Sequence, residues 1–154
     1  MQKRPTTRTP RIYCAHECQV RDVYCRSLPN LRPDKRLVKT ELRYATAARR
    51  VDMRTVDRFG TFREWEFKIR ADQRTLGQLL IYLAHARREL AFRPIRGVIA
   101  AFEIPEELRL GVEVMSLSIE FVTIPAWMSG AGFVPATTNC DMKPTKIVTG
   151  DRTK

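Results

Sequence analysis

The hydrophobic positions along the middle of the chain follow two different periods. Residues 49–56 and 61–69 alternate apolar and polar side chains, which predicts two β-strands. Residues 71–90 repeat leucines at helical spacing after Asp72, a suitable N-cap, which predicts an amphipathic helix. The centre of the chain is therefore expected to contain a β-hairpin followed by a helix.

The elements on either side of this unit extend the alternation of helix and strand. The other predicted elements are a short helix at 32–40, an extended segment at 41–46, a strand at 96–104, a helix at 105–114 and a strand at 117–124. This order predicts an α/β fold with a central mixed β-sheet flanked by helices, in the sequence α-β-β-β-α-β-α-β.

The chain of 154 residues is 44% hydrophobic, which is enough for one ordinary core. We expect a basic, cysteine-containing extension at 1–32, a folded core at 33–125 and a tail at 126–154. No apolar run approaches the about 18 residues of a membrane span, and no apolar segment follows the charged N-terminus. We therefore expect a soluble protein of the cytoplasm, or of the host-cell cytoplasm for a viral protein, with no membrane partner.

The net charge of +11 is concentrated before the core. Residues 1–50 hold 13 Lys and Arg against 4 Asp and Glu, whereas residues 51–140 hold 11 of each. Such a segment suits a polyphosphate partner, because Lys and Arg release condensed counterions from nucleic acid, although it also suits a solvated basic surface. The candidate nucleic-acid-binding residues are Lys35, Arg36, Lys39, Arg43, Arg49 and Arg50.

The register of the predicted hairpin follows from its loop. With Gly60 in the left-handed position of a three-residue loop, paired residue numbers sum to 118. Asp52 then lies directly opposite Glu66, on the face that also carries Lys68. Opposed carboxylates are destabilising unless a positive group lies between them, and Mg²⁺ or Mn²⁺ bound through both is one solution. The alternative is an exposed hairpin with solvated charges.

The order of these residues resembles the PD-(D/E)XK nuclease superfamily, and especially its RecB-like branch, which includes CRISPR-associated adaptation nucleases and the NucS nuclease domain. The resemblance covers about residues 33–124, including "VDM", "EFK" and "QLLIY", the last matching a Q-x-x-x-Y helix motif. Val51 replaces the proline of the motif name. The resemblance implies a restriction-endonuclease-like core.

The same resemblance implies a role for each matched residue. Asp52 and Glu66 would bind the metal, together with the backbone carbonyl of Phe67, and Lys68 would orient or activate the attacking water. The remaining matches are Glu41, as an outer or water-mediated ligand at the end of the first helix, and Gln78 and Tyr82, lining the site near the scissile phosphate. Gln78 and Tyr82 are also four residues apart on one helix, so they could simply bond each other.

Four cysteines flank the predicted core, and one iron–sulfur cluster or one Zn²⁺ needs four ligands. They are Cys14, Cys18, Cys25 and Cys140. RecB-like nucleases with such a cluster place one cysteine before the core and three after it, the reverse of the order here. Free or disulfide-bonded cysteines are the alternative.

Together with these patterns, the resemblance implies a Mg²⁺-dependent DNA nuclease that hydrolyses phosphodiester bonds through a metal-activated water. Two alternatives stay open: a catalytically inactive protein of the same fold that binds or packages nucleic acid, and an accessory DNA-repair protein. A homodimer is also considered, because one site cuts one strand.

Overall fold

The computed structural model describes residues 17–45 and 50–129. Their elements are α1 (Glu17–Leu31), β1 (Lys35–Arg43), β2 (Arg50–Asp57), β3 (Phe62–Arg70), α2 (Gln73–Glu89), β4 (Ile95–Glu103), α3 (Glu106–Val114), β5 (Ile119–Thr123) and the 3₁₀ helix η1 (Ala126–Ser129). The predicted order α-β-β-β-α-β-α-β is confirmed. No helix among these described segments is long and apolar enough to cross a membrane.

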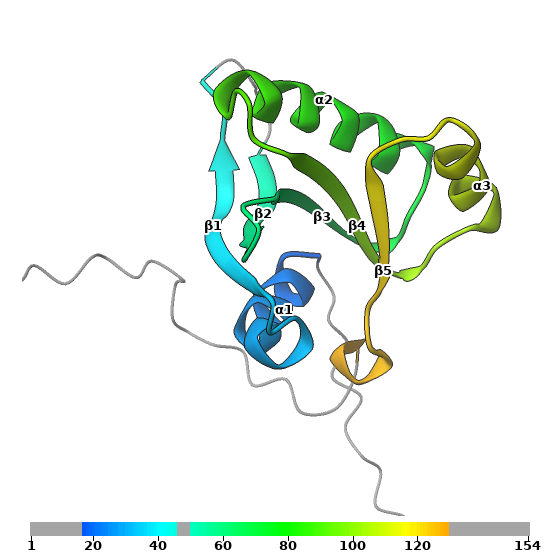
Figure 1. Cartoon of the computed structure of the whole chain (residues 1–154). Coiled ribbons are helices and arrows are strands. Elements are labelled where there is room, and N and C mark those ends of the chain that lie inside the picture. Colours follow the sequence, from blue (N-terminus) through cyan, green and yellow to red (C-terminus); the bar gives the residue numbers. More distant parts are fainter. Residues whose placement is uncertain (1–16, 46–49, 130–154) are drawn as a thin grey trace, which may run out of the picture.

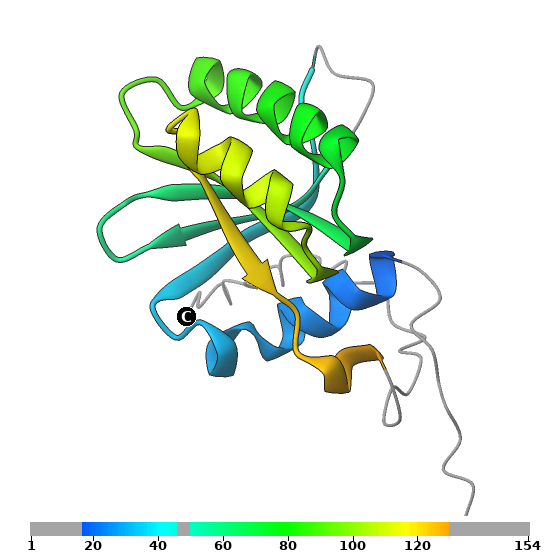
Figure 2. The ribbon, with the colours of Figure 1, turned by 90° about the vertical axis from the view of Figure 1, so that its right-hand side faces the viewer.

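The five strands form one mixed sheet in the order β1-β2-β3-β4-β5. The pairs β1-β2 and β2-β3 are antiparallel, whereas β3-β4 and β4-β5 are parallel. The helices α2 and α3 connect β3 to β4 and β4 to β5, and both connections run in the same direction across the sheet. Because such parallel connections are right-handed, both helices lie on the same face of the sheet. The other face is covered by α1 and η1 (Figures 1 and 2).

The alternation along β3 sorts its side chains between two environments. Trp65 and Phe67 are fully buried in the core beneath α1, where they pack around Tyr24. Glu64 and Glu66 occupy the intervening positions and are also almost completely buried. The side chains of Glu64 and Glu66 therefore carry carboxylates into the interior of the protein and not into the solvent.

The predicted hairpin register is confirmed. Met53 pairs with Trp65 and Arg54 with Glu64, both of which sum to 118. Gly60 has a φ of +81°, the left-handed conformation that the loop requires.

The prediction of a helix at 32–40 is wrong, because most of this segment belongs to β1. A turn bond from the Lys35 N–H to the Arg32 carbonyl closes the corner after α1, and Lys35 then pairs with Asp57 of β2. Pro33 and Asp34 resemble a helix start locally, but pairing with β2 overrides that propensity.

The first helix is α1, within the segment expected to be an extension. Its buried residues Val20, Tyr24 and Leu28 recur every four positions and pack on the sheet. Met128 of η1, within the segment expected to be a tail, joins the same core cluster.

Candidate active site at the end of the β2–β3 hairpin

Asp52 and Glu66 lie close together where the pairing of β2 with β3 ends, at the end of these strands that is far from the hairpin turn. The backbone N–H of Phe67 donates a hydrogen bond of 2.8 Å to Asp52 Oδ2, which fixes the aspartate against the neighbouring strand. Glu66 is only 2% exposed. The hairpin thus brings two carboxylates together in a largely dry environment, as the register predicts.

The surroundings disfavour ionisation of both carboxylates. Burial, followed by the charge of Asp52, raises the pKa of Glu66 to about 7. Burial also raises the pKa of Asp52, against the opposing effects of the Phe67 N–H and of Lys68. One oxygen of Glu66, Oε2, is buried without any hydrogen-bond partner among the described residues. A cation between the two groups would relieve both conditions.

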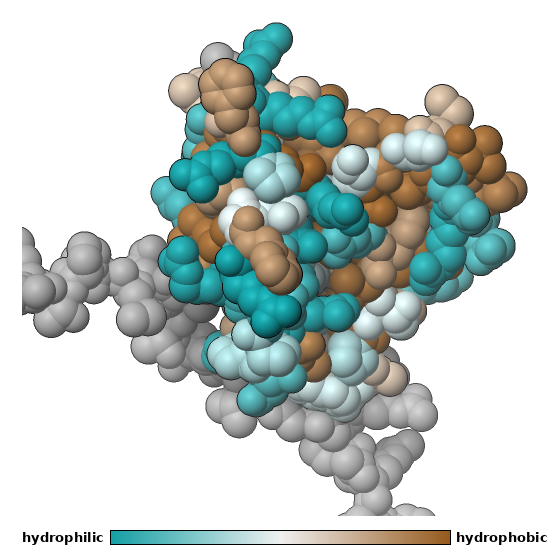
Figure 3. All heavy atoms as spheres, viewed as in Figure 1, coloured by the Kyte–Doolittle hydropathy of each residue, from teal (hydrophilic) through white to brown (hydrophobic). Residues whose placement is uncertain are grey.

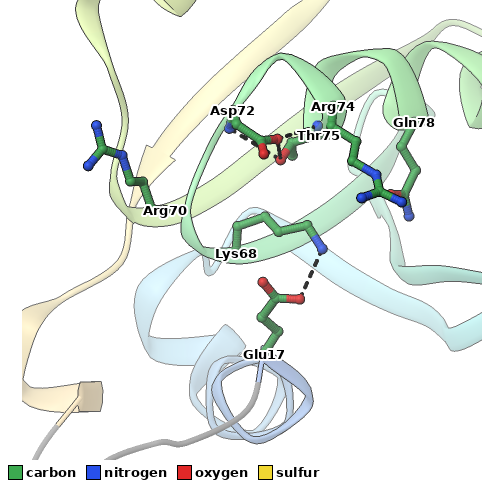
Figure 4. A pocket seen from close by; sticks show the side chains of 7 residues that line it. All are labelled: Glu17, Lys68, Arg70, Asp72, Arg74, Thr75 and Gln78. Atoms are coloured by element: carbon green, nitrogen blue, oxygen red, sulfur yellow. Dashed lines mark hydrogen bonds and ion pairs between the residues drawn. The ribbon is translucent and has the colours of Figure 1, made fainter.

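Lys68 is held between two carboxylates. Its Nζ lies 3.1 Å from Glu66 Oε1. It also lies 2.9 Å from Glu17 Oε2, and Figure 4 shows this second contact. Burial lowers the pKa of Lys68, but the hydrogen bonds and charges of Glu17 and Glu66 outweigh it and raise the pKa above its usual value. Lys68 is therefore a fixed positive charge, suited to orienting a water or stabilising an anion and not to accepting a proton.

Glu17 is a member of the site that sequence reasoning missed. It occupies the first turn of α1, and its charge raises the pKa values of both Asp52 and Glu66. The four-residue spacing of Val20, Tyr24 and Leu28 could have predicted this helix, which begins at Glu17.

Glu41 does not join these carboxylates. It belongs to β1, not to the end of a helix, and its two oxygens accept bonds from Arg21 at 3.0 Å and Arg50 at 3.1 Å. Its φ of +49° is unusual for a residue other than glycine. Among the described residues, no three His, Cys, Asp or Glu side chains converge as a metal cluster would require.

Gln78 and Tyr82 form an ordered pair on α2. The Gln78 amide donates a 2.8 Å hydrogen bond to the Tyr82 hydroxyl, and Tyr82 is only 1% exposed. Gln78 itself lines a pocket beside Lys68. Gln78 thus makes the local bond and also lines the pocket, whereas Tyr82 belongs to the core cluster that includes Leu79 and Leu83. A role of Tyr82 near a scissile phosphate stays a prediction.

This pocket has a volume of about 450 Å³ and carries mostly polar and charged side chains. Its lining residues are Glu17, Lys68, Arg70, Asp72, Arg74, Thr75 and Gln78. Figure 4 shows Arg74 and Gln78 projecting from the first turns of α2 near the amino group of Lys68. Asp72 caps α2 by accepting a 2.7 Å bond from the Thr75 N–H, so its carboxylate is engaged locally. The cations of this pocket suit an anionic ligand.

Most of the predicted nucleic-acid-binding residues lie on the edge strand β1. Arg36, Lys39 and Arg43 are exposed there. Lys35 is paired with Asp34 at 2.7 Å, and Arg50 of β2 with Glu41, so these two are partly neutralised. Arg49 lies outside the described residues.

The cysteine staple falls largely outside the described segments, which contain neither Cys14 nor Cys140. Cys18 is exposed on α1, whereas Cys25 is partly buried with its sulfur 3.2 Å from that of Met53. A four-cysteine cluster stays a prediction.

Comparison with known proteins places the fold among repair endonucleases. No family model and no curated protein matches the sequence. EndoMS in complex with dsDNA is similar, with a TM-score of 0.59 and 20% identity, covering 71% of this chain and 45% of that chain. A repair endonuclease from Pyrococcus abyssi gives 0.59 and 20%, covering 73% and 49%, and EndoMS in apo form gives 0.54 and 18%, covering 71% and 47%.

The chain thus spans just under half the length of these similar proteins. At this identity the similarity concerns the fold, and the predicted resemblance to the NucS type is confirmed at that level. This chain has the restriction-endonuclease-like fold of the EndoMS repair endonucleases.

Proposed function

We propose that this protein is a DNA nuclease that hydrolyses phosphodiester bonds with the help of Mg²⁺ or Mn²⁺. The observation that carries the proposal is the pairing of Asp52 and Glu66, two carboxylates whose pKa values are both raised, beside the fixed cation Lys68. An endonuclease fold is the context in which such a constellation favours phosphodiester chemistry.

The donor set fits a hard divalent cation. Asp52 and Glu66 offer carboxylate oxygens, including Glu66 Oε2, which has no partner in the part of the chain that the structure describes. Mg²⁺ commonly binds through one or two carboxylates and completes its coordination with water and phosphate oxygens, so the absence of a third converging ligand among the described residues is compatible with it. A bound ion would supply Lewis acidity and lower the pKa of a water.

The chain's own cations would act on the phosphate. In hydrolysis, a water oxygen forms a bond to phosphorus and the P–O bond to one nucleoside breaks, leaving a phosphate monoester and a hydroxyl. Lys68 Nζ, fixed by Glu17 and Glu66, stabilises the negative charge that develops on the phosphate oxygens. Arg74 lines the same pocket and binds the phosphate, and the Gln78 amide adds a neutral contact.

Glu17 takes the outer position that the sequence resemblance assigned to Glu41. It contacts Lys68 directly and acts electrostatically on both carboxylates, whereas Glu41 is occupied by Arg21 and Arg50. Glu17 therefore positions Lys68 and holds an outer-shell water, and Glu41 has a structural role on β1.

DNA is the substrate class that the comparisons favour, because EndoMS has been seen in complex with dsDNA. The exposed cations Arg36, Lys39 and Arg43 extend along β1 and would bind the phosphate backbone beyond the pocket.

The test is cleavage of end-labelled single- and double-stranded DNA with Mg²⁺, Mn²⁺ or EDTA. We expect cutting only with metal, and a rate reduced about a hundredfold or more by Glu66→Gln and by Lys68→Met. Glu64→Gln is the matched control, because Glu64 is an equally buried glutamate on the same strand that lies outside the site.

Equal losses in all three variants would indicate general damage to the fold and would contradict the assignment of Glu66. Tight, EDTA-insensitive DNA binding without cutting would replace the proposal with a binding protein built on the nuclease fold.

A further inference from the structure

The helix α2 carries a second apolar stripe on the side that faces away from the sheet. Gly77, Leu80, Ile81 and Ala84 are all exposed, and their spacing of three, four and seven residues places them on one side of the helix. Ile81 is 59% exposed and Leu80 39%. The stripe is distinct from the buried residues of α2, which pack on the sheet.

The neighbouring helix α3 repeats this feature. Leu110 is 57% exposed and Val114 69%, and Gly111 lies between them on the outer side. Met115 follows at the helix end, 69% exposed. Figure 3 shows hydrophobic residues gathered along the upper and right-hand parts of the molecule, over α2 and α3. Adjacent helices with apolar outer sides form a patch of the kind that marks an interaction surface.

Glycines within the two stripes add an independent observation. Glycine in the middle of a helix is destabilising relative to alanine. A Cβ built at Gly97 would collide with Leu79 at 2.8 Å, so the packing of α2 on β4 explains that residue. A Cβ at Gly77 or Gly111 would meet nothing within 4 Å. Nothing in the described molecule requires these glycines, whereas close approach of another helix would.

The charges that border the stripes are opposite in sign on the two helices. Arg74 lines the pocket of the candidate site, so the border of the α2 stripe consists of Arg87 and Arg88 with Glu89. The border of the α3 stripe consists of Glu106, Glu107 and Glu113 with Arg109. Glu89 already binds Arg54, and Arg109 already stacks on Phe121. Within the described residues, the other five border charges make no ion pair, so the basic border of one copy can pair with the acidic border of another.

We propose that the outer faces of α2 and α3 form the interface of a homodimer. A two-fold axis parallel to the helices places α2 of one copy on α3 of its partner. The apolar stripes then meet, and the basic border of α2 faces the acidic border of α3 twice. A second copy fits better than nucleic acid, because the patch is apolar and one half of its border is acidic.

The first test is the mass of the full chain in solution, measured by sedimentation velocity in EDTA and without DNA. A dimer is expected at micromolar concentrations. Ile81→Glu and Leu110→Glu each weaken it about tenfold or more, because they bury a charge in the apolar stripe. Phe59→Glu, on the exposed β2–β3 turn, is the matched control and leaves the dimer intact.

Charge exchange identifies the partner as a second copy. The variant Arg87→Glu, Arg88→Glu has two acidic borders, and the variant Glu107→Arg, Glu113→Arg has two basic borders. Each alone is expected to be monomeric, and an equimolar mixture to form a heterodimer. Failure of the mixture to associate would overturn the proposed pairing of α2 with α3.

Glycine replacement separates association from folding. Gly77→Gln and Gly111→Gln introduce good helix formers at open positions, so the thermal stability of the monomer is maintained or raised. The dimer nevertheless weakens about tenfold or more, because the side chains hold the helices apart. The proposal would be overturned if the wild-type chain stayed monomeric, or if the affinity of the dimer did not change with these substitutions. A monomer that bound a different protein through this face would replace it. None of these outcomes depends on nuclease activity.

Discussion

Glu64 and Glu66 lie on the same face of β3, and burial raises the pKa of each to about 7, but their neighbours differ in sign. Glu64 accepts a hydrogen bond from Arg54, whose charge opposes the effect of burial. Glu66 faces Asp52, whose charge adds to the effect of burial. Each glutamate keeps one buried oxygen that has no partner within the described segments, so that feature alone does not distinguish them.

The comparison shows which buried carboxylate is structural and which is a ligand candidate. Arg54 also binds Tyr44 at 2.8 Å and Glu89 at 3.0 Å, so the charge of Glu64 faces a cation that the chain itself holds in place, although Glu64 Oε2 has no partner among the described residues. The Asp52–Glu66 pair has Lys68 nearby and also senses the charge of Arg21, but Arg21 is paired with Asp22 and Glu41, and Glu17 adds a further carboxylate. The Asp52–Glu66 pair is therefore the candidate for binding a further cation.

Removal of the cation from the Glu64 cluster has the largest expected effect on stability. Arg54→Met leaves Glu64 buried without compensation, and we expect a loss of about 3–5 kcal/mol in the free energy of unfolding, measured with urea. Arg50→Met is the control. Arg50 pairs with Glu41 where both side chains are more than 40% exposed, so its loss should cost less than about 1 kcal/mol. Similar losses in both variants would contradict the assignment of a buried ion pair.

The pH dependence of stability in EDTA sharpens the comparison. The folded-state pKa of Glu66, about 7, lies above its ordinary value of 4.5, so the native state binds more protons between these values. The stabilisation from this group is complete below about pH 4.5 and is lost as the pH rises through about 7, up to about 3 kcal/mol.

Glu66→Gln should flatten this fall in the urea-unfolding profile. Saturating Mg²⁺ should flatten it as well in the wild type, since the ion favours the ionised pair. The fall due to Glu64 is not expected to respond to Mg²⁺, and an unchanged profile with the ion would count against a metal between Asp52 and Glu66.

Neutralising each glutamate at pH 8 without metal should have unequal effects. Glu66→Gln removes a buried charge and its repulsion from Asp52, and is expected to stabilise the fold by about 1 kcal/mol. Glu64→Gln also removes a buried charge, but it weakens a charge-assisted bond to Arg54, so the two effects oppose each other and the gain is expected to be smaller. Thermal unfolding of the two variants in EDTA gives the comparison, and an equal or larger stabilisation by Glu64→Gln would remove the distinction between the clusters.

The smallest expected effect on stability concerns Glu17. Its contact with Lys68 is partly exposed, so Glu17→Gln should cost less than about 1 kcal/mol in urea unfolding. The DNA-cleavage rate should nevertheless fall about tenfold or more, because Lys68 loses its fixed position. Glu41→Gln should leave the rate unchanged, and the reverse result would restore the assignment that the sequence resemblance implies.

The sequence predicted the parts of the site that depend on residue spacing within a hairpin or a helix. Loop length and Gly60 determine the hairpin register, so the meeting of Asp52 and Glu66 follows without tertiary information. The N-cap Asp72 and the leucine spacing likewise determine how α2 presents Gln78.

The remaining features depend on contacts between distant segments. The edge strand β1 is exposed along most of its length and therefore shows no alternation, so its local helix-start residues gave the wrong element. Glu17 reaches Lys68 across 51 residues of sequence, and no local pattern records that contact. The same holds for Glu89, whose contact with Arg54 helps to hold that cation beside Glu64.

The most direct test of the central claim is Mn²⁺ binding to the full chain, followed by electron paramagnetic resonance. We predict that the wild type and Glu64→Gln bind Mn²⁺ equally, whereas Glu66→Gln and Asp52→Asn bind it at least about tenfold more weakly. Absence of Mn²⁺ binding by the wild type, or equal binding by Glu66→Gln, would contradict a metal site at the end of the β2–β3 hairpin.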